Sequence, residues 1–84
     1  MKRNLMLIYL RNRQGTAEKV QKILTAWGCL IKTRLGIHDD VLDNCTDTGI
    51  IFLELVGDEK QHKEMERKLN LLGDVDAKLV TMEI

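Results

Sequence analysis

The sequence predicts an α+β fold, a ferredoxin-like βαββαβ sandwich with a four-stranded antiparallel sheet and two helices on one face. Three observations lead to this prediction. The chain has 84 residues, no proline and no low-complexity linker, which indicates a single domain over residues 1–84. Four apolar, strand-like segments flank two segments with helical periodicity. Right-handed βαβ crossovers then place the first and third strands at the centre of the sheet and the other two at its edges.

The first half of the chain contains a strand, a helix and a second strand. Residues 4–11, "NLMLIYLR", are rich in β-forming side chains and too few for a packed helix. Thr16 is the expected N-cap of the following helix, and Gly28 is the expected glycine just after its C-terminus. Residues 29–37, "CLIKTRLGI", alternate as an edge strand, with Cys29 expected in the core. The expected buried stripe of the helix is Ala17, Val20, Leu24 and Trp27.

The second half repeats this arrangement after a polar connection at residues 38–48. Residues 49–57, "GIIFLELVG", form a strongly apolar strand. Asp58 is the expected N-cap of the second helix, and Gly73 ends that helix. Residues 75–84, "VDAKLVTMEI", alternate as the last strand. The expected buried stripe of the second helix is His62, Met65, Leu69 and Leu72.

The two central strands are apolar at nearly every position, which is typical of strands buried on both faces. Two helices can cover only one face of the sheet. Because side chains alternate across a strand, one set of apolar residues must face away from the helices. On the first strand the two alternatives are Met6, Ile8 and Leu10, or Leu5, Leu7 and Tyr9; on the third strand they are Ile51, Leu53 and Leu55, or Ile50, Phe52 and Val56. We expect a second copy of the chain to cover the exposed set, in a homodimer or higher oligomer.

The charge of the chain excludes one class of protein. Thirteen basic and thirteen acidic residues give zero formal net charge, and one small basic cluster, Lys2, Arg3, Arg11 and Arg13, is too little for a stand-alone nucleic-acid-binding domain. No apolar run approaches the roughly 18 residues of a membrane span, and the N-terminus lacks a signal-peptide cleavage pattern. We therefore expect a cytoplasmic protein with reduced cysteines, no membrane contact and no cofactor.

One polar stretch, "GIHDDVLDNC" at residues 36–45, contains chemically capable side chains. His38, Asp39, Asp40 and Cys45 are of the types that bind divalent metals. Their spacing matches no closed zinc pattern, so a solvated connection between strands is the favoured interpretation and a metal site is the alternative. Acidic neighbours would raise the pKa of the Cys45 thiol, and no base is evident, so we do not expect an enzyme.

A second candidate site precedes the first helix, where residues 11–16 read "RNRQGT". Basic side chains, an amide and the N-terminal amides of the helix together suit an anion. The candidate ligand-binding residues are therefore Arg13, Gln14, Gly15 and Thr16. The alternative is a connection that only turns the chain.

The βαββαβ order and three short stretches carry a family resemblance. "GTAEKVQKIL", "TRLGIHD" and "GIIFLELVGDE" resemble the ACT-like family of regulators of the iron-only hydrogenase system, over nearly the whole chain. The resemblance implies an ACT-like ferredoxin fold that self-associates in a bacterial regulatory setting. ACT domains commonly bind small effectors at subunit interfaces near the loop after the first strand, which here is residues 11–16.

The resemblance extends in fold to the C-terminal domain of nickel-responsive regulators, which bind metal between subunits through histidines and a cysteine. This sequence lacks the histidine-rich strand, so no metal site carries over to His38 or Cys45. The expected function is a homo-oligomeric regulatory or sensing module that binds a small effector or a partner protein at a subunit interface. The alternatives are a metal-binding domain that uses the His38–Cys45 loop, a small enzyme of unknown reaction, and a purely structural oligomer.

Overall fold

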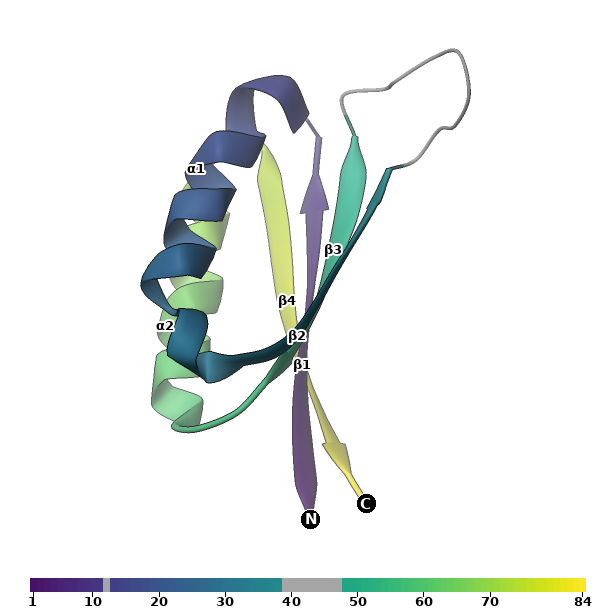
Figure 1. Cartoon of the computed structure of the whole chain (residues 1–84), viewed down its shortest axis with the longest axis vertical. Coiled ribbons are helices and arrows are strands. Elements are labelled where there is room, and N and C mark those ends of the chain that lie inside the picture. The colour runs from purple at the N-terminus through teal and green to yellow at the C-terminus, as the bar shows by residue number, and fades with distance from the viewer. Residues whose placement is uncertain (12, 39–47) are drawn as a thin grey trace.

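The computed structural model describes residues 1–11, 13–38 and 48–84, and the side chains of residues 13, 14 and 38 lie outside this description. Its elements follow the predicted βαββαβ order, with one additional 3₁₀ turn, η1 (Figure 1). No helix of the described residues is long and apolar enough to cross a membrane. The elements are β1 (Lys2–Leu10), α1 (Arg13–Ala26), η1 (Gly28–Leu30), β2 (Ile31–His38), β3 (Gly49–Leu55), α2 (Glu59–Asn70) and β4 (Val75–Glu83).

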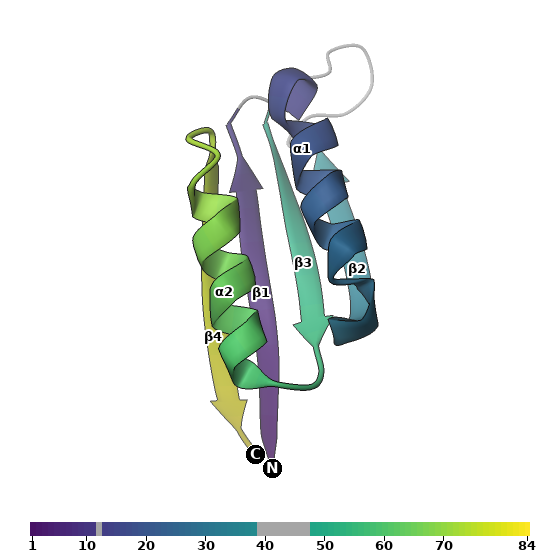
Figure 2. The ribbon, with the colours of Figure 1, turned by 90° about the vertical axis from the view of Figure 1, so that its left-hand side faces the viewer.

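The strands form one antiparallel sheet in the order β2-β3-β1-β4, so β1 and β3 are central as predicted. Both helices lie on the same side of this sheet (Figure 1). The view from the helix side places α1 in front of β3 and β2, and α2 in front of β1 and β4 (Figure 2). The predicted fold class, a ferredoxin-like sandwich with two helices on one face, is confirmed.

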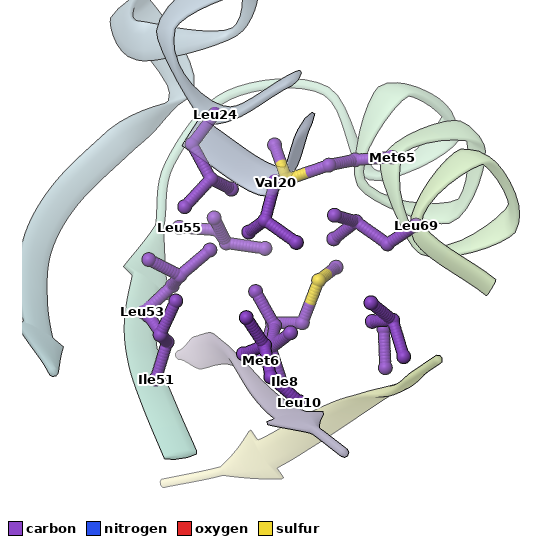
Figure 3. Close-up of a cluster of buried hydrophobic side chains, with 12 residues drawn as sticks. Met6, Ile8, Leu10, Val20, Leu24, Ile51, Leu53, Leu55, Met65 and Leu69 are labelled. Atoms are coloured by element: carbon purple, nitrogen blue, oxygen red, sulfur yellow. The ribbon is translucent and has the colours of Figure 1, made fainter. Parts of the chain in front are cut away.

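The hydrophobic core lies between the helices and the sheet, where side chains of both layers point toward one another (Figure 3). The structure shows which side chains of each strand face the helices. The even-numbered residues of β1 and the odd-numbered residues of β3 face the helices. Each fully buried apolar side chain contributes roughly 1.5–3 kcal/mol to the stability of the fold. The core consists of Met6, Ile8, Leu10, Val20, Leu24, Ile51, Leu53, Leu55, Met65, Leu69, Val75 and Ala77.

The ends of α1 differ from the sequence prediction. The helix begins at Arg13, so Thr16 is not its N-cap. Thr16 lies in the first turn instead, buried, and its hydroxyl donates a hydrogen bond to Asp74 Oδ2 at 3.4 Å. Gly28 does not adopt left-handed backbone angles and opens η1. Cys29, predicted in the core, is exposed because the tight turn of η1 places it before the strand begins.

Helix α2 begins as predicted, and it ends at Asn70, three residues before the predicted Gly73. The Asp58 carboxylate accepts a hydrogen bond from the Lys60 backbone N–H at 2.9 Å, which caps the N-terminus. After the helix, Gly73 has φ of 84°, in the region that favours glycine, and the chain turns there into β4. His62, Met65 and Leu69 are buried, as the predicted stripe requires.

Two side chains of α2 also cover the outer edge of β4. The Asn70 amide accepts a hydrogen bond from Ala77 N at 2.8 Å and donates one to Ala77 O at 3.0 Å. The Glu66 carboxylate accepts a hydrogen bond from Leu79 N at 2.6 Å. Three of the backbone groups that an additional strand would need here, Ala77 N, Ala77 O and Leu79 N, are therefore already bonded.

Candidate functional site

The side of the sheet away from the helices carries a broad apolar surface, here called the open face. In an antiparallel sheet, directly paired residues point to the same side. One row across the four strands is Leu35, Phe52, Leu7 and Lys78, and the next is Ile37, Ile50, Tyr9 and Asp76. The open face comprises Leu5, Leu7, Tyr9, Leu35, Ile37, Ile50, Phe52, Val80 and Met82.

Several of these side chains are strongly exposed, although all are apolar. The exposed fractions are 38% for Leu7, 39% for Phe52, 44% for Ile37, 49% for Met82 and 55% for Leu35. A shallow hollow of about 300 Å³ lies among residues of β1, β3 and β4, and Asp76 and Lys78 of β4 line one side of it. Contiguous apolar surface of this kind is uncommon on monomeric proteins and marks an interaction surface.

Charged pairs occupy two opposite ends of the open face, and Lys78 lies between them on its β4 side. At one end, Arg3 Nη2 lies 2.7 Å from Glu54 Oε2. At the other end, the Arg11 guanidinium pairs with the Asp76 carboxylate. An apolar centre with polar ends is the usual composition of a protein–protein interface.

The predicted ligand-binding residues do not form a loop. Arg13, Gln14, Gly15 and Thr16 make up the first turn of α1, where a helix directs its backbone amides outward. Thr16 is 4% exposed and hydrogen-bonded to Asp74, so its hydroxyl helps hold α1 to the connection before β4. The side chains of Arg13 and Gln14 lie outside the described residues.

The surroundings of this turn are more acidic than the sequence indicated. Besides pairing with Asp76, Arg11 donates from Nη2 to Gly73 O at 3.0 Å, and its backbone N–H donates to Asp74 O at 2.8 Å. The carboxylates of Asp74 and Asp76 therefore lie close to the turn. The first turn is less suited to a strongly charged anion than the "RNRQGT" stretch alone indicates.

A small groove of about 230 Å³ opens beside this turn, between α1 and the ends of the three neighbouring strands. Gly36 contributes to its space, because its strand partner Ile51 faces the helices and a Cβ at Gly36 would meet no atom within 4 Å. Among the described residues that line the groove, Gln21 has the only polar side chain. The lining residues are Leu10, Ala17, Gln21, Gly36, Ile37, Gly49, Ile50 and Ile51.

A buried histidine outside these sites has a structural role. His62 has no exposed surface, and its Nε2 lies 2.8 Å from Val56 O. That carbonyl can only accept, so we assign the proton to Nε2, and Nδ1 then faces the Asn4 amide nitrogen at 3.4 Å. Asn4 in turn accepts a hydrogen bond from Thr81 Oγ1 at 2.8 Å. The cluster ties α2 to β1 and β4.

The metal and nucleophile hypotheses fall on the part of the chain that is not described. Asp39, Asp40 and Cys45, together with the His38 side chain, lie outside the described residues. Within residues 1–11, 13–38 and 48–84, no group of three or more His, Cys, Asp or Glu side chains could hold a metal ion. The hypotheses for the 38–47 stretch therefore stay predictions.

The fold and the open face define a class: a small ferredoxin-like sandwich with an ACT-like arrangement and one uncovered apolar sheet surface. No protein-family model matches the chain. No curated protein matches it either.

Three solved structures are similar to it in fold. An uncharacterized protein from Thermotoga maritima has a TM-score of 0.82 at 24% identity, over 99% of this chain and 100% of that one. CPII is a nitrogen regulatory PII-like protein from Thiomonas intermedia that was solved with ADP, AMP and bicarbonate. It has a TM-score of 0.63 at 10% identity, over 100% of this chain and 96% of that one. An ACT domain protein from Streptococcus pneumoniae has a TM-score of 0.58 at 15% identity, over 95% of this chain and 89% of that one. At these identities the likeness is one of fold, and at that level it supports the ACT-like expectation.

Proposed function

We propose that this protein is a small regulatory, ligand-sensing domain that works as a homodimer or higher oligomer joined through the open face. The observation that carries the proposal is the open face itself, whose apolar side chains have no cover from the described residues. The fold shared with ACT domain and PII-like proteins supports the regulatory part of the proposal.

Simple energetics support self-association. Covering a side chain that is about half exposed gains about 1 kcal/mol, so the five exposed side chains on each of two copies gain about 10 kcal/mol. Loss of translational and rotational freedom costs roughly 4–15 kcal/mol. Because the gain and the cost are similar, we expect an oligomer that dissociates on dilution.

Sedimentation velocity over a range of micromolar concentrations tests the assembly. Phe52→Lys places a charge in the middle of the open face and should shift the protein to the monomer. Leu71→Lys is the matched control, because Leu71 is also exposed and apolar but follows α2, away from the sheet. A 9.7 kDa monomer for the unmodified chain at every concentration would contradict the proposal.

The proposed effector site is the first turn of α1, with Arg13, Gln14, Gly15 and Thr16, together with the groove beside it. The turn offers backbone amides to a polar group of the ligand, and the uncharged groove suits an apolar moiety of the same small molecule. A partner protein that inserts a side chain into the groove is the alternative occupant.

Thermal-shift screening tests the effector site, since a ligand that binds only the folded state raises its stability. Amino acids, divalent metals, bicarbonate and adenine nucleotides form the first panel, because CPII was solved with ADP, AMP and bicarbonate. Gly36→Leu should fill the groove and abolish a shift that depends on it. Gly28→Ala is the control, because a Cβ there also meets nothing within 4 Å. Equal shifts in both variants would place the ligand elsewhere.

We further infer that the domain is not an enzyme, needs no cofactor and acts in the cytoplasm as a regulator connected with the iron-only hydrogenase system. This inference rests on the sequence resemblance and on the buried, hydrogen-bonded state of His62. Deletion of the gene should change hydrogenase transcript levels or activity in the host. Unchanged levels of both would remove the hydrogenase connection.

A further inference from the structure

We propose that the outer edge of β2 is a docking site for an extended, acidic segment of a partner protein, which adds to the sheet as a fifth strand. The inference goes beyond the proposed function, because it requires neither self-association through the open face nor a small effector. Addition of a strand to a sheet edge is a recurring mode of peptide recognition, in which backbone hydrogen bonds supply affinity and side chains supply specificity.

The two edges of the sheet differ in how they are covered. At the β4 edge, Asn70 and Glu66 already bond the outward backbone groups of Ala77 and Leu79. Among the described strands, β2 has a neighbour only on the β3 side, and residues 32–37 are all exposed. Within the described ranges, no side chain bonds to the backbone of these six residues. Strand addition is therefore available at β2 and is blocked at Ala77 and Leu79 of β4.

Charge selects the kind of strand that can dock. Lys32 and Arg34 are both exposed on β2, and neither pairs with a carboxylate anywhere in the described part of the chain. A second β2 in antiparallel register around residue 33 or 34 would bring these cations opposite each other, which is unfavourable. Positive charges on an edge strand thus discourage pairing between copies and favour a strand that carries carboxylates.

Gly36 adds a steric feature to this edge. It has no side chain to obstruct an approaching backbone, and the space beyond its Cα is open. Arg34 and Gly36 pair with Leu53 and Ile51, so both lie on the helix side of the strand, whereas Leu35 pairs with Phe52 on the open face. The partner strand should therefore place carboxylates on the helix side, opposite Arg34, and apolar side chains on the other side, opposite Leu35.

The added strand would also lie against the proposed effector site. Gly36 and Ile37 belong both to the exposed edge and to the lining of the groove beside α1. A docked strand would cover that side of the groove, so a small molecule in the groove and a strand on β2 would affect each other's binding.

Titration of the ¹⁵N-labelled protein with synthetic peptides, followed by NMR, tests the proposal. The probe is a blocked eight-residue peptide that alternates valine with glutamate, and its counterpart carries lysine in place of glutamate. We expect the glutamate peptide to shift the amide signals of residues 31–37 and to bind about tenfold more tightly than the lysine peptide, since the cross-strand pair at Arg34 and the interaction with the nearby Lys32, which lies at an irregularity of the strand, both change sign. A glutamate peptide N-methylated at alternate residues should not bind, because it cannot complete the backbone ladder.

Charge reversal sharpens the test. The double variant Lys32→Glu, Arg34→Glu should lose the preference for the glutamate peptide and gain one for the lysine peptide, which shows that it remains folded. Lys78→Glu is the control, because Lys78 lies on β4 and on the open face. Equal binding of the two peptides, or shifts confined to the open face, would overturn the proposal. So would concentration-dependent shifts of β2 without peptide, which would indicate a second copy on this edge. The titration is repeated with the Phe52→Lys variant, which should be monomeric. Peptide binding by this variant would show that docking at β2 does not depend on the proposed self-association.

Discussion

The two faces of the sheet have similar composition and different surroundings. On the helix side, Met6, Ile8 and Leu53 are at most 2% exposed, whereas Leu7 and Phe52, one residue away on the same strands, are 38% and 39% exposed. An apolar side chain stabilises a folded state only to the extent that something removes it from water. The helix-covered face therefore stabilises the single chain, and the open face can contribute only when a partner covers it.

The largest expected effect comes from truncating one leucine on each face. Leu53→Ala should lower the free energy of unfolding by about 3 kcal/mol, because it leaves a cavity among packed side chains. Leu35→Ala removes the same atoms from a side chain that is 55% exposed, and should cost less than about 1 kcal/mol in dilute protein. Urea unfolding at a concentration where the chain is monomeric measures both. Equal losses of unfolding free energy would mean that the open face is as well packed in the single chain as the helix-covered face.

The N-cap of α2 gives the next effect in size. Asp58→Ala removes the carboxylate that accepts from the Lys60 N–H, and should cost about 1 kcal/mol of unfolding free energy. Asp58→Asn keeps a capping oxygen and serves as the control. Thermal unfolding of the two variants checks the prediction, and an alanine variant as stable as the asparagine variant would argue against a capping role.

Salt should separate the open face from the β2 edge. Assembly through apolar contact should change little between about 0.05 and 0.5 M salt, whereas binding of the glutamate peptide to Lys32 and Arg34 should weaken, because exposed charges are screened. Sedimentation and the NMR titration, each repeated at both salt concentrations, give the two responses. If assembly also weakens with salt, charges such as the Arg3–Glu54 pair take part in it.

The smallest expected effect lies on the solvent side of α2. The hydrogen bond from Arg67 Nε to Glu64 Oε2, at 3.0 Å, holds the pKa of Glu64 below its ordinary value. A lowered pKa in the folded state means a contribution to stability that is present above the ordinary pKa and is lost as the pH falls through the lowered one. Arg67→Met should return the pKa of Glu64 toward its ordinary value in an NMR titration, with unfolding barely affected. An unchanged pKa would show that the pair does not persist in solution.

The order of elements and most of the core could be predicted, because these depend on local periodicity. Val20, Leu24, Met65 and Leu69 recur at helical spacing and are buried as predicted. The face that stays open could not be predicted from β1, because Met6 and Ile8 are no more apolar as a set than Leu5 and Leu7. Only the positions of the helices decide between the two sets.

The missed features depend on contacts between distant residues. Threonine is a common N-cap residue, which is why the sequence predicts that Thr16 caps α1. Its hydroxyl instead donates a hydrogen bond to Asp74, which is 58 residues away in the sequence. The cover of the β4 edge by Asn70 and Glu66 has no sequence signal until the position of α2 over the sheet is known. The groove is equally invisible in sequence, where Gly36 is only a glycine within a strand.

The covered β4 edge also bears on the kind of polymer this chain can form. Endless head-to-tail growth requires two complementary free edges on every copy, so that each added molecule leaves a new place for the next. Asn70 and Glu66 occupy the edge of β4 at Ala77 and Leu79, so a strand cannot pair along the whole of this edge. A copy that joined another through β2 would therefore not offer a continuous β4 edge to the next copy, which works against ribbons that grow without end.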